Sequence, residues 1–244
     1  MKRVIYNSPS NHGVGQNKCR HKNCYEDKHT KPIALKADKL FEKCGFKSIV
    51  ADDDTGILNG DRTAEANKAG ADLYIAYHTN AFSDKKTRYL LFMCYRTDGE
   101  YRKLFNCVKK YMEKIYDGEI IFKAVDDLYE INSPDAMTFY CEFGFHTNQK
   151  DCDDFIHNPD DIAEALVKGV CDYYGVKYAF EPFKVKTKSN LIIRKSASLL
   201  SKKVGRTKKG HVYTIVDVSA NGKRGKLKSG LGWVTITSKY CSKV

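Results

Sequence analysis

Short apolar runs alternate with longer amphipathic stretches over residues 1–176, and this alternation is what most narrows the fold. Short apolar runs are typical of buried strands, whereas apolar residues every three to four positions are typical of helices. Strand and helix in regular succession favour a mainly parallel twisted sheet flanked by helices. The expected strands are residues 2–6, 46–51, 72–78, 88–95, 126–131 and 137–143.

The helices expected between these strands are residues 32–44, 61–69, 100–115 and 159–174. Pro159 can occupy the first position of the last helix, behind an Asn158 cap. Gly45 and Gly175 are typical helix stops. An α/β domain is therefore predicted for residues 1–176.

The pattern changes after this domain. Residues 177–182 are interpreted as a linker, and residues 183–244 show period-two alternation with basic turns. The strands expected there are residues 183–187, 191–194, 211–218, 225–228 and 233–237. This pattern predicts a small all-β barrel as a second domain, which suits a chain of 244 residues.

The positive charge of the chain is concentrated in its last part. Residues 181–244 contain 16 Lys or Arg and two acidic residues, a net charge of +14, whereas residues 1–180 have a net charge of −2. Such asymmetry indicates a polyanionic partner. Cell wall with its anionic polymers, nucleic acid and membrane surfaces all qualify on charge alone.

The cysteine content and the hydropathy of the chain indicate the cellular compartment in which the protein is made. Nine cysteines, an odd number without a Cys-x-x-Cys pair, indicate reduced thiols rather than a disulfide framework. No apolar run approaches the ~20 residues of a membrane-spanning helix. The chain passes from Met1-Lys2-Arg3 directly into an expected strand, so we expect a protein made in the cytoplasm without a signal peptide.

Polar residues stand where the expected strands run out into loops. His12 follows the first strand, His78 ends the third, and Glu142 lies among aromatic residues in the last. The carboxyl ends of neighbouring parallel strands meet at one edge of a sheet, where sites gather. Glu26 lies fourteen residues after His12, across a polar loop that can curl back to this edge. Together these four side chains predict a metal site.

Around these residues the sequence resembles the zinc-dependent N-acetylmuramoyl-L-alanine amidases, which cleave the bond between the muramic acid lactyl group and the first L-alanine of peptidoglycan. The likeness covers residues 1–176 and is strongest at His78-Thr79-Asn80-Ala81 and Glu142-Phe143-Gly144-Phe145. It implies that His12, Glu26 and His78 bind Zn2+. An open fourth position would then make water a nucleophile at neutral pH.

The resemblance also assigns the remaining roles. Glu142 would be the general base that takes a proton from the water and passes it to the leaving nitrogen. Its aromatic neighbours would reduce its solvation and raise its pKa toward the working range. Asn80 is a candidate substrate-binding residue, as a donor to the oxyanion.

Several neighbouring residues allow other interpretations. His21, Asp27 and His29 could each replace Glu26 as a ligand. Cys19, His21 and Cys24 have ligand chemistry but lack the paired spacing of a zinc knuckle, so this stretch is interpreted as a polar loop. His146 could assist the oxyanion or cap the next helix. Arg62 could order the loop after the second strand or contact a substrate carboxylate.

The last part of the chain resembles the bacterial Src-homology-3 domains that anchor lytic enzymes to peptidoglycan. The residues that carry this likeness are 191–198, 209–213, 225–230 and 232–234. Two positions depart from the family pattern: Ser196-Ala197 replaces the usual Gly-Pro, and Arg224 replaces a common tryptophan. The resemblance implies a cell-wall-binding domain over residues 183–244.

The resulting hypothesis is a peptidoglycan hydrolase, an endolysin or autolysin, that uses zinc-activated water with Glu142 as general base. Its expected partners are Gram-positive peptidoglycan and anionic wall polymers, reached after release from the cell, as a phage or prophage endolysin is. The alternatives are a non-catalytic cell-wall-binding protein, a zinc peptidase acting on the stem peptide, and a nucleic-acid binder. The scattered tyrosines of the basic domain form no obvious stacking platform, which argues against nucleic acid.

Overall fold

The computed structural model describes residues 2–10, 12, 14–51, 59–180, 182–219 and 222–244. The chain forms two compact units, Met1–Tyr178 and Ala179–Val244. Within the described residues, no helix combines the length and the hydropathy needed to cross a membrane. All nine cysteines are free thiols.

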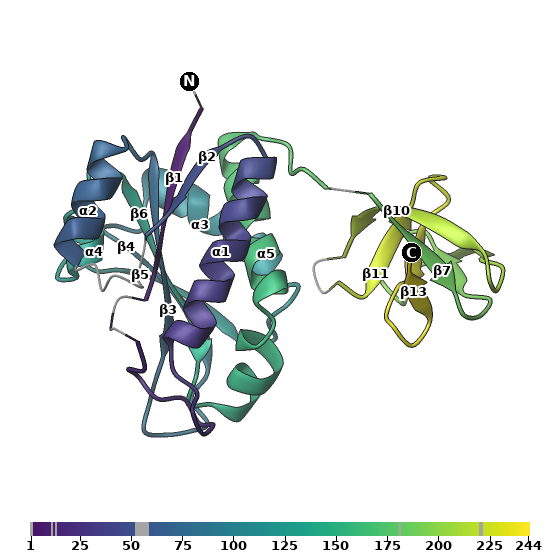
Figure 1. Ribbon diagram of the computed structural model, residues 1–244, viewed down its shortest axis with the longest axis horizontal. Coiled ribbons are helices and arrows are strands. Elements are labelled where there is room, and N and C mark those ends of the chain that lie inside the picture. Colours follow the sequence, from purple (N-terminus) through teal and green to yellow (C-terminus); the bar gives the residue numbers. More distant parts are fainter. Residues whose placement is uncertain (1, 11, 13, 52–58, 181, 220–221) are drawn as a thin grey trace. The chain divides into compact units, whose positions relative to one another are not determined.

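The first unit is built on a six-stranded sheet with the order β2-β1-β3-β6-β4-β5 (Figure 1). Strands β2, β1, β3 and β6 are mutually parallel, while β4 and β5 run parallel to each other and antiparallel to β6. The prediction of a mainly parallel sheet flanked by helices is confirmed. The strands are β1 Val4–Pro9, β2 Lys47–Val50, β3 Leu73–Asn80, β4 Tyr89–Cys94, β5 Glu119–Ala124 and β6 Met137–Phe145.

Helices cover both faces of this sheet (Figure 1). The helices α1 (Asp27–Lys43), α3 (Gly99–Met112) and α5 (Pro159–Tyr174) enclose the larger apolar core, whereas α2 (Asn59–Lys68) and α4 (Tyr129–Asn132) flank the other face. Helices α3 and α5 approach closely at Gly169, where a Cβ atom would lie 2.5 Å from the Cα of Val108. Only glycine fits this contact.

Two sequence predictions for this unit are wrong. Residues 126–131 contain no strand, because Ile131 in the single helical turn α4, and Leu128 just before it, pack on the core. The edge strand is instead β5, which the pattern did not predict. Helix α1 begins at Asp27 rather than at Pro32, because His29 and Thr30 are already buried in helical geometry.

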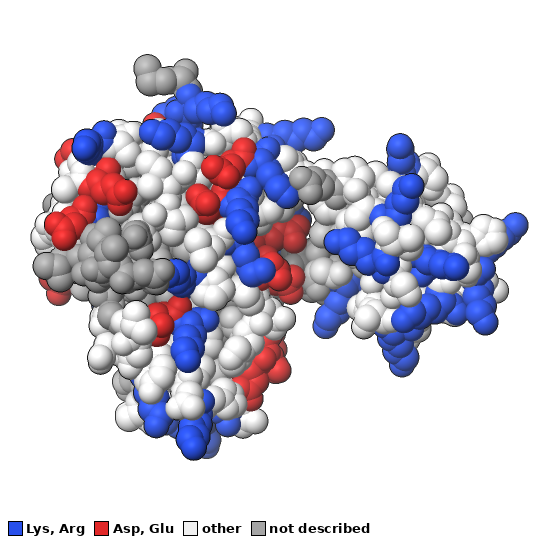
Figure 2. Space-filling model, in the orientation of Figure 1, with Lys and Arg blue, Asp and Glu red and all other residues white. Residues whose placement is uncertain are grey.

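The second unit contains a seven-stranded sheet with the order β13-β7-β10-β11-β12-β8-β9, and every pairing is antiparallel. Its closure into a barrel stays a prediction. Lys and Arg side chains are spread over the face of this unit that Figure 2 shows. The strands are β7 Phe183–Thr187, β8 Ile192–Arg194, β9 Lys203–Arg206, β10 Val212–Val218, β11 Arg224–Leu227, β12 Trp233–Thr235 and β13 Cys241–Lys243.

Candidate metal centre

The three predicted ligands lie together at the carboxyl ends of β1 and β3, with His78 among the last residues of β3 itself. Nδ1 of His78 lies 3.2 Å from Oε1 of Glu26, and Nε2 of His12 lies 3.8 Å from Oε2 of Glu26. All three residues offer donor atoms within 4.8 Å of one another. Because zinc bonds of ~2.0–2.1 Å in a tetrahedral site place donors about 3.3 Å apart, this set fits a zinc ion after small movements.

The topology explains why these residues meet. β1 lies between β2 and β3, and the helices that follow β1 and β2 lie on opposite faces of the sheet. The ends of β1 and β3 therefore border a topological switch point, where open α/β sheets bind ligands. The ring of Tyr140 on β6 stacks on His78 with 4.4 Å between centroids and 6° between planes, which fixes the imidazole.

Hydrogen bonds hold Glu26 as a carboxylate. It accepts bonds from the backbone N–H of Thr79 at 3.0 Å and from the side-chain amide of Asn17 at 2.6 Å. Burial by itself raises the pKa of Glu26, but these bonds and the His78 imidazole outweigh it and lower the pKa to about 2. Glu26 is thus ionised at neutral pH, as a metal ligand must be.

The structure reveals Glu130 as a further residue of the site, which the sequence analysis missed. This buried carboxylate of α4 lies with Oε2 3.1 Å from Nε2 of His78, and its Oε1 accepts bonds from Ser8 and Tyr74. A ligating histidine almost always donates its second ring N–H to such a partner. Glu130 therefore orients Nδ1 of His78 toward Glu26. The available signal was a carboxylate between Tyr129 and Ile131 in an apolar run.

The two carboxylates also set the charge of His78. Burial by itself lowers the pKa of His78, but the hydrogen bonds to Glu130 and Glu26 outweigh it and raise the pKa to about 10. Without a metal ion, an imidazolium bridges the two acids. Zinc binding would release the proton from Nδ1, so zinc affinity should be pH-dependent.

Replacing Glu130 with glutamine is expected to weaken zinc binding about 10- to 100-fold, because His78 loses its charged orienting partner. Competition with a chromophoric chelator measures the affinity without any assay of activity. Glu65→Gln is the matched control, since Glu65 binds the Tyr6 hydroxyl on the same face of the sheet. Equal zinc affinities for Glu130→Gln and Glu65→Gln would remove the positioning role.

Glu142 on β6 lies beside the three ligands. It is in register with His78 on the neighbouring strand. Its Oε2 is buried and has no hydrogen-bond partner among the described residues. Burial raises the pKa of Glu142 to about 7, with the His78 charge opposing this shift and Glu26 adding to it. A carboxylate that is half-protonated near neutral pH can both accept and return a proton.

Asn80 and His146 border this group on the same edge. The side-chain oxygen of Asn80 accepts a bond from the Ala81 backbone N–H, and its backbone carbonyl accepts one from His146. His146 is buried, and its Nδ1 lies 3.1 Å from the Thr79 carbonyl. Burial lowers the pKa of His146, which favours the neutral ring with its proton on Nδ1. The roles of both residues toward a substrate stay predictions.

The other residues considered from the sequence lie in different surroundings. Arg62 is buried and donates to the hydroxyl of Ser8 and the carbonyl of Pro9, so it fixes the end of β1. The residues after β2 that it was expected to order, 52–58, lie outside the described residues. Within the described residues, His21, Asp27 and His29 do not join the donor set of His78.

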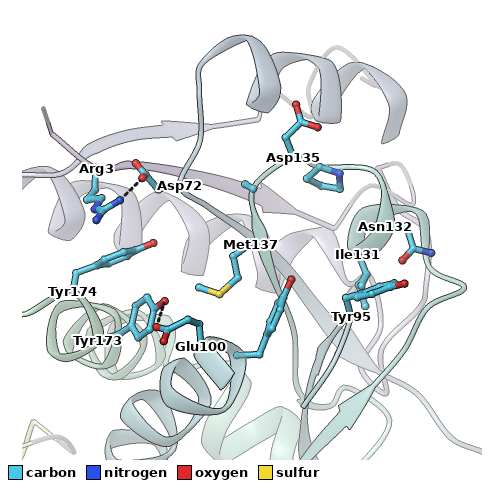
Figure 3. A pocket seen from close by; sticks show the side chains of 13 residues that line it. Arg3, Asp72, Tyr95, Glu100, Ile131, Asn132, Asp135, Met137, Tyr173 and Tyr174 are labelled. Atoms are coloured by element: carbon cyan, nitrogen blue, oxygen red, sulfur yellow. Dashed lines mark hydrogen bonds and ion pairs between the residues drawn. The ribbon is translucent and has the colours of Figure 1, made fainter. Parts of the chain in front are cut away.

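A cavity of about 560 Å³ lies at the other end of the strands, by the amino ends of β1, β3 and β6 (Figure 3). It is lined by Arg3 and Asp72, which precede β1 and β3, by Met137 at the start of β6, and by Tyr173 and Tyr174 of α5. Arg3 and Asp72 form an ion pair of 2.7 Å there. This cavity is therefore separate from the candidate metal centre.

Comparisons with solved structures identify the fold. AmiC2, an N-acetylmuramoyl-L-alanine amidase of Nostoc punctiforme, superposes with a TM-score of 0.62 at 16% identity, over 72% of this chain and 98% of that chain. The catalytic domain of the amidase CwlV from Bacillus (Paenibacillus) polymyxa var. colistinus gives 0.60 at 19% identity, over 72% and 100%. The catalytic domain of the CD27L endolysin, which targets Clostridia difficile, superposes with a TM-score of 0.57 at 20% identity, over 70% of this chain and 97% of that chain.

The imidazoles of His12 and His78 and the carboxylate of Glu26 form a donor set typical of hydrolytic zinc enzymes, with Glu142 beside it. Residues 10–172, more than half of the chain, match the family model described as N-acetylmuramoyl-L-alanine amidase. The chain belongs to this family. No curated protein matches it in a sequence search.

Proposed function

We propose that this protein is a zinc-dependent N-acetylmuramoyl-L-alanine amidase that cleaves Gram-positive peptidoglycan. The observation that carries the proposal is the buried Oε2 of Glu142, which has no hydrogen-bond partner among the described residues and lies beside the donor set of His12, Glu26 and His78. An unpaired buried carboxylate destabilises a fold, so its presence here favours a chemical role. Membership of the amidase family supports the choice of bond.

In the proposed reaction, His12, Glu26 and His78 hold the zinc ion. Zinc, when bound, lowers the pKa of water and polarises a carbonyl group. Glu142 accepts the proton of the attacking water and delivers it to the nitrogen of the leaving L-alanine. Glu130 keeps the His78 imidazole in the required tautomer, and Tyr140 holds its plane. The exposed side chain of His12 keeps the site open to a polymeric substrate.

The rate should depend on pH through Glu142. This residue acts as a base only when deprotonated, so kcat/KM should fall as the pH drops through its pKa. Burial raises the pKa of Glu142 from 4.5 to about 7, and a bound cation would shift it back toward 4.5, so the acidic limb should lie between these values. Measuring zinc content at each pH separates this limb from metal loss. A flat profile over this range with zinc retained would contradict the assignment.

The basic second unit is proposed to bind the cell wall. Its net charge of +14 over residues 181–244 suits the anionic polymers of Gram-positive walls. We further propose that the protein acts as an endolysin, reaching the wall after release from the cell. The similarity of the first unit to the CD27L endolysin catalytic domain supports this role.

Release of dye-labelled fragments from purified walls tests the proposal against a non-catalytic wall-binding protein. The full-length protein is expected to release dye. This activity should be lost after chelation and should return when zinc is added. A protein that sediments with the walls yet releases no dye at any zinc concentration would be a binding protein, and the proposed activity would be abandoned.

A further inference from the structure

A second group of potential metal ligands lies near the candidate metal centre and shares no residue with it. Cys24, His29, Cys152 and His157 offer donor atoms that all lie within 4.8 Å of one another. Cys19 packs in the same cluster, against Cys24 and Cys152. Cys19 and Cys24 come from the loop before α1, His29 from α1, and the other two from the η1 helix (Asp151–Ile156) and the residue after it.

Hydrogen bonding does not account for this arrangement. The sulfur atoms of Cys19 and Cys24 both lie 3.0 Å from the same atom, Nε2 of His29. That nitrogen of a neutral histidine carries either one hydrogen or one lone pair, so it cannot pair well with two thiols. A shared cation would satisfy all three atoms. In a tetrahedral site, Zn–S bonds of ~2.3 Å and Zn–N bonds of ~2.0 Å separate S and N by about 3.5 Å, so an outward shift of about 0.5 Å is enough.

Burial and spacing are those of a structural zinc site. Cys19, Cys24, His29 and Cys152 are buried, so these four donors are shielded from solvent, whereas His157 is exposed. Four residues separate Cys19 from Cys24, the upper limit of the Cys–Cys spacings in structural zinc sites, although not the two-residue spacing of a zinc knuckle. This stretch is a loop, as the sequence analysis interpreted it, but Cys19 and Cys24 are buried within it and cluster with Cys152, which is distant in sequence.

We propose that this cluster binds a structural zinc ion through Cys24, His29 and Cys152, with Cys19 or His157 as the fourth ligand. The ion joins the loop that leads to Glu26 with η1, which follows β6. A hydrogen bond from the Arg20 N–H to the His146 carbonyl already links these segments. Zinc at the cluster thus stabilises the loop that positions Glu26, whether or not the candidate metal centre binds zinc.

Metal analysis of the full-length protein, purified under reducing conditions with zinc, tests this proposal. The Cys24→Ser/Cys152→Ser variant should contain one zinc ion fewer per chain than the wild type. Cys107→Ser is the matched control, because this half-buried cysteine of α3 lies outside the cluster. His78→Ala should lose the zinc ion of the candidate metal centre and keep the zinc ion of the cysteine cluster. This result distinguishes a failure of the structural zinc site from a failure of the proposed function.

Cobalt substitution of the wild type tests the site without any variant. Thiolate ligands should produce a strong near-ultraviolet charge-transfer band, which persists in His78→Ala. If Cys19 is the fourth ligand, Cys19→Ala should weaken the band. If His157 is the fourth ligand, His157→Ala should preserve the band and weaken cobalt affinity. Absence of the band from the wild type would overturn the proposal, and so would a disulfide between Cys24 and Cys152 in protein purified under reducing conditions.

Discussion

Replacing Glu142 with glutamine is expected to lower kcat/KM on peptidoglycan by at least about 100-fold, the lower range for loss of a general base. Glutamine has nearly the same shape but cannot accept the proton of the attacking water. Zinc content and wall binding should stay at wild-type values, because Glu142 is not among the three proposed ligands. Dye release and metal analysis on the same preparations measure both effects.

Glu113→Gln provides the matched control for this substitution. Its exposed carboxylate, directly after α3, lies 3.7 Å from the Lys109 ammonium and far from β6 in sequence, so activity should be unchanged. A fully active Glu142→Gln protein would remove the assignment of the base. Loss of zinc from Glu142→Gln would instead make Glu142 a ligand, which also contradicts the proposed division of roles.

Replacing His78 with alanine is expected to abolish zinc binding at the candidate metal centre and to destabilise the metal-free protein by about 3–5 kcal/mol. The reason is that Glu26 and Glu130 both lose the cation between them while remaining buried. Two uncompensated carboxylates then disfavour the fold. Urea unfolding after chelation measures the loss.

The pH of that experiment follows from the pKa shifts. The raised pKa of His78 contributes stability that is complete below 6.5 and is lost as the pH rises through about 10. The lowered pKa of Glu26 contributes stability that is complete above 4.5 and is lost as the pH falls through about 2. At pH 6 both contributions are present, so the difference between His78→Ala and wild type should be largest near this value.

His211→Ala is the control for this measurement, because His211 is an exposed histidine in the second unit. It should leave zinc content and unfolding free energy unchanged. A His78→Ala protein as stable as the wild type near pH 6 would show that Glu26, His78 and Glu130 do not carry the charges described.

Sequence patterns predicted the parts of the fold that depend on long, regular runs. Strands β1, β2, β3 and β6 and helix α5 follow directly from their apolar periodicity. The meeting of His12 and His78 was expected because the carboxyl ends of neighbouring parallel strands lie together. Glu26 was added by the resemblance to the zinc amidases. The aromatic surroundings of Glu142 likewise indicated a raised pKa.

The errors arise where a segment is short or where partners come from distant parts of the chain. A single helical turn has no periodicity to distinguish it from a strand, so α4 was predicted as part of a strand. That error also hid Glu130, whose role depends on contact with His78. The cluster around His29 was missed because Cys152 and His157 join it only through the tertiary fold.

Mass spectrometry of the products from purified Gram-positive peptidoglycan tests the central claim most directly. The wild-type protein with zinc should release intact stem peptides that begin with a free L-alanine amine and leave the glycan strands uncut. Chelation and the Glu142→Gln substitution should each prevent this release. Stem peptides cut between amino acids, with the muramic acid–alanine bond intact, would contradict the amidase assignment and establish a peptidase.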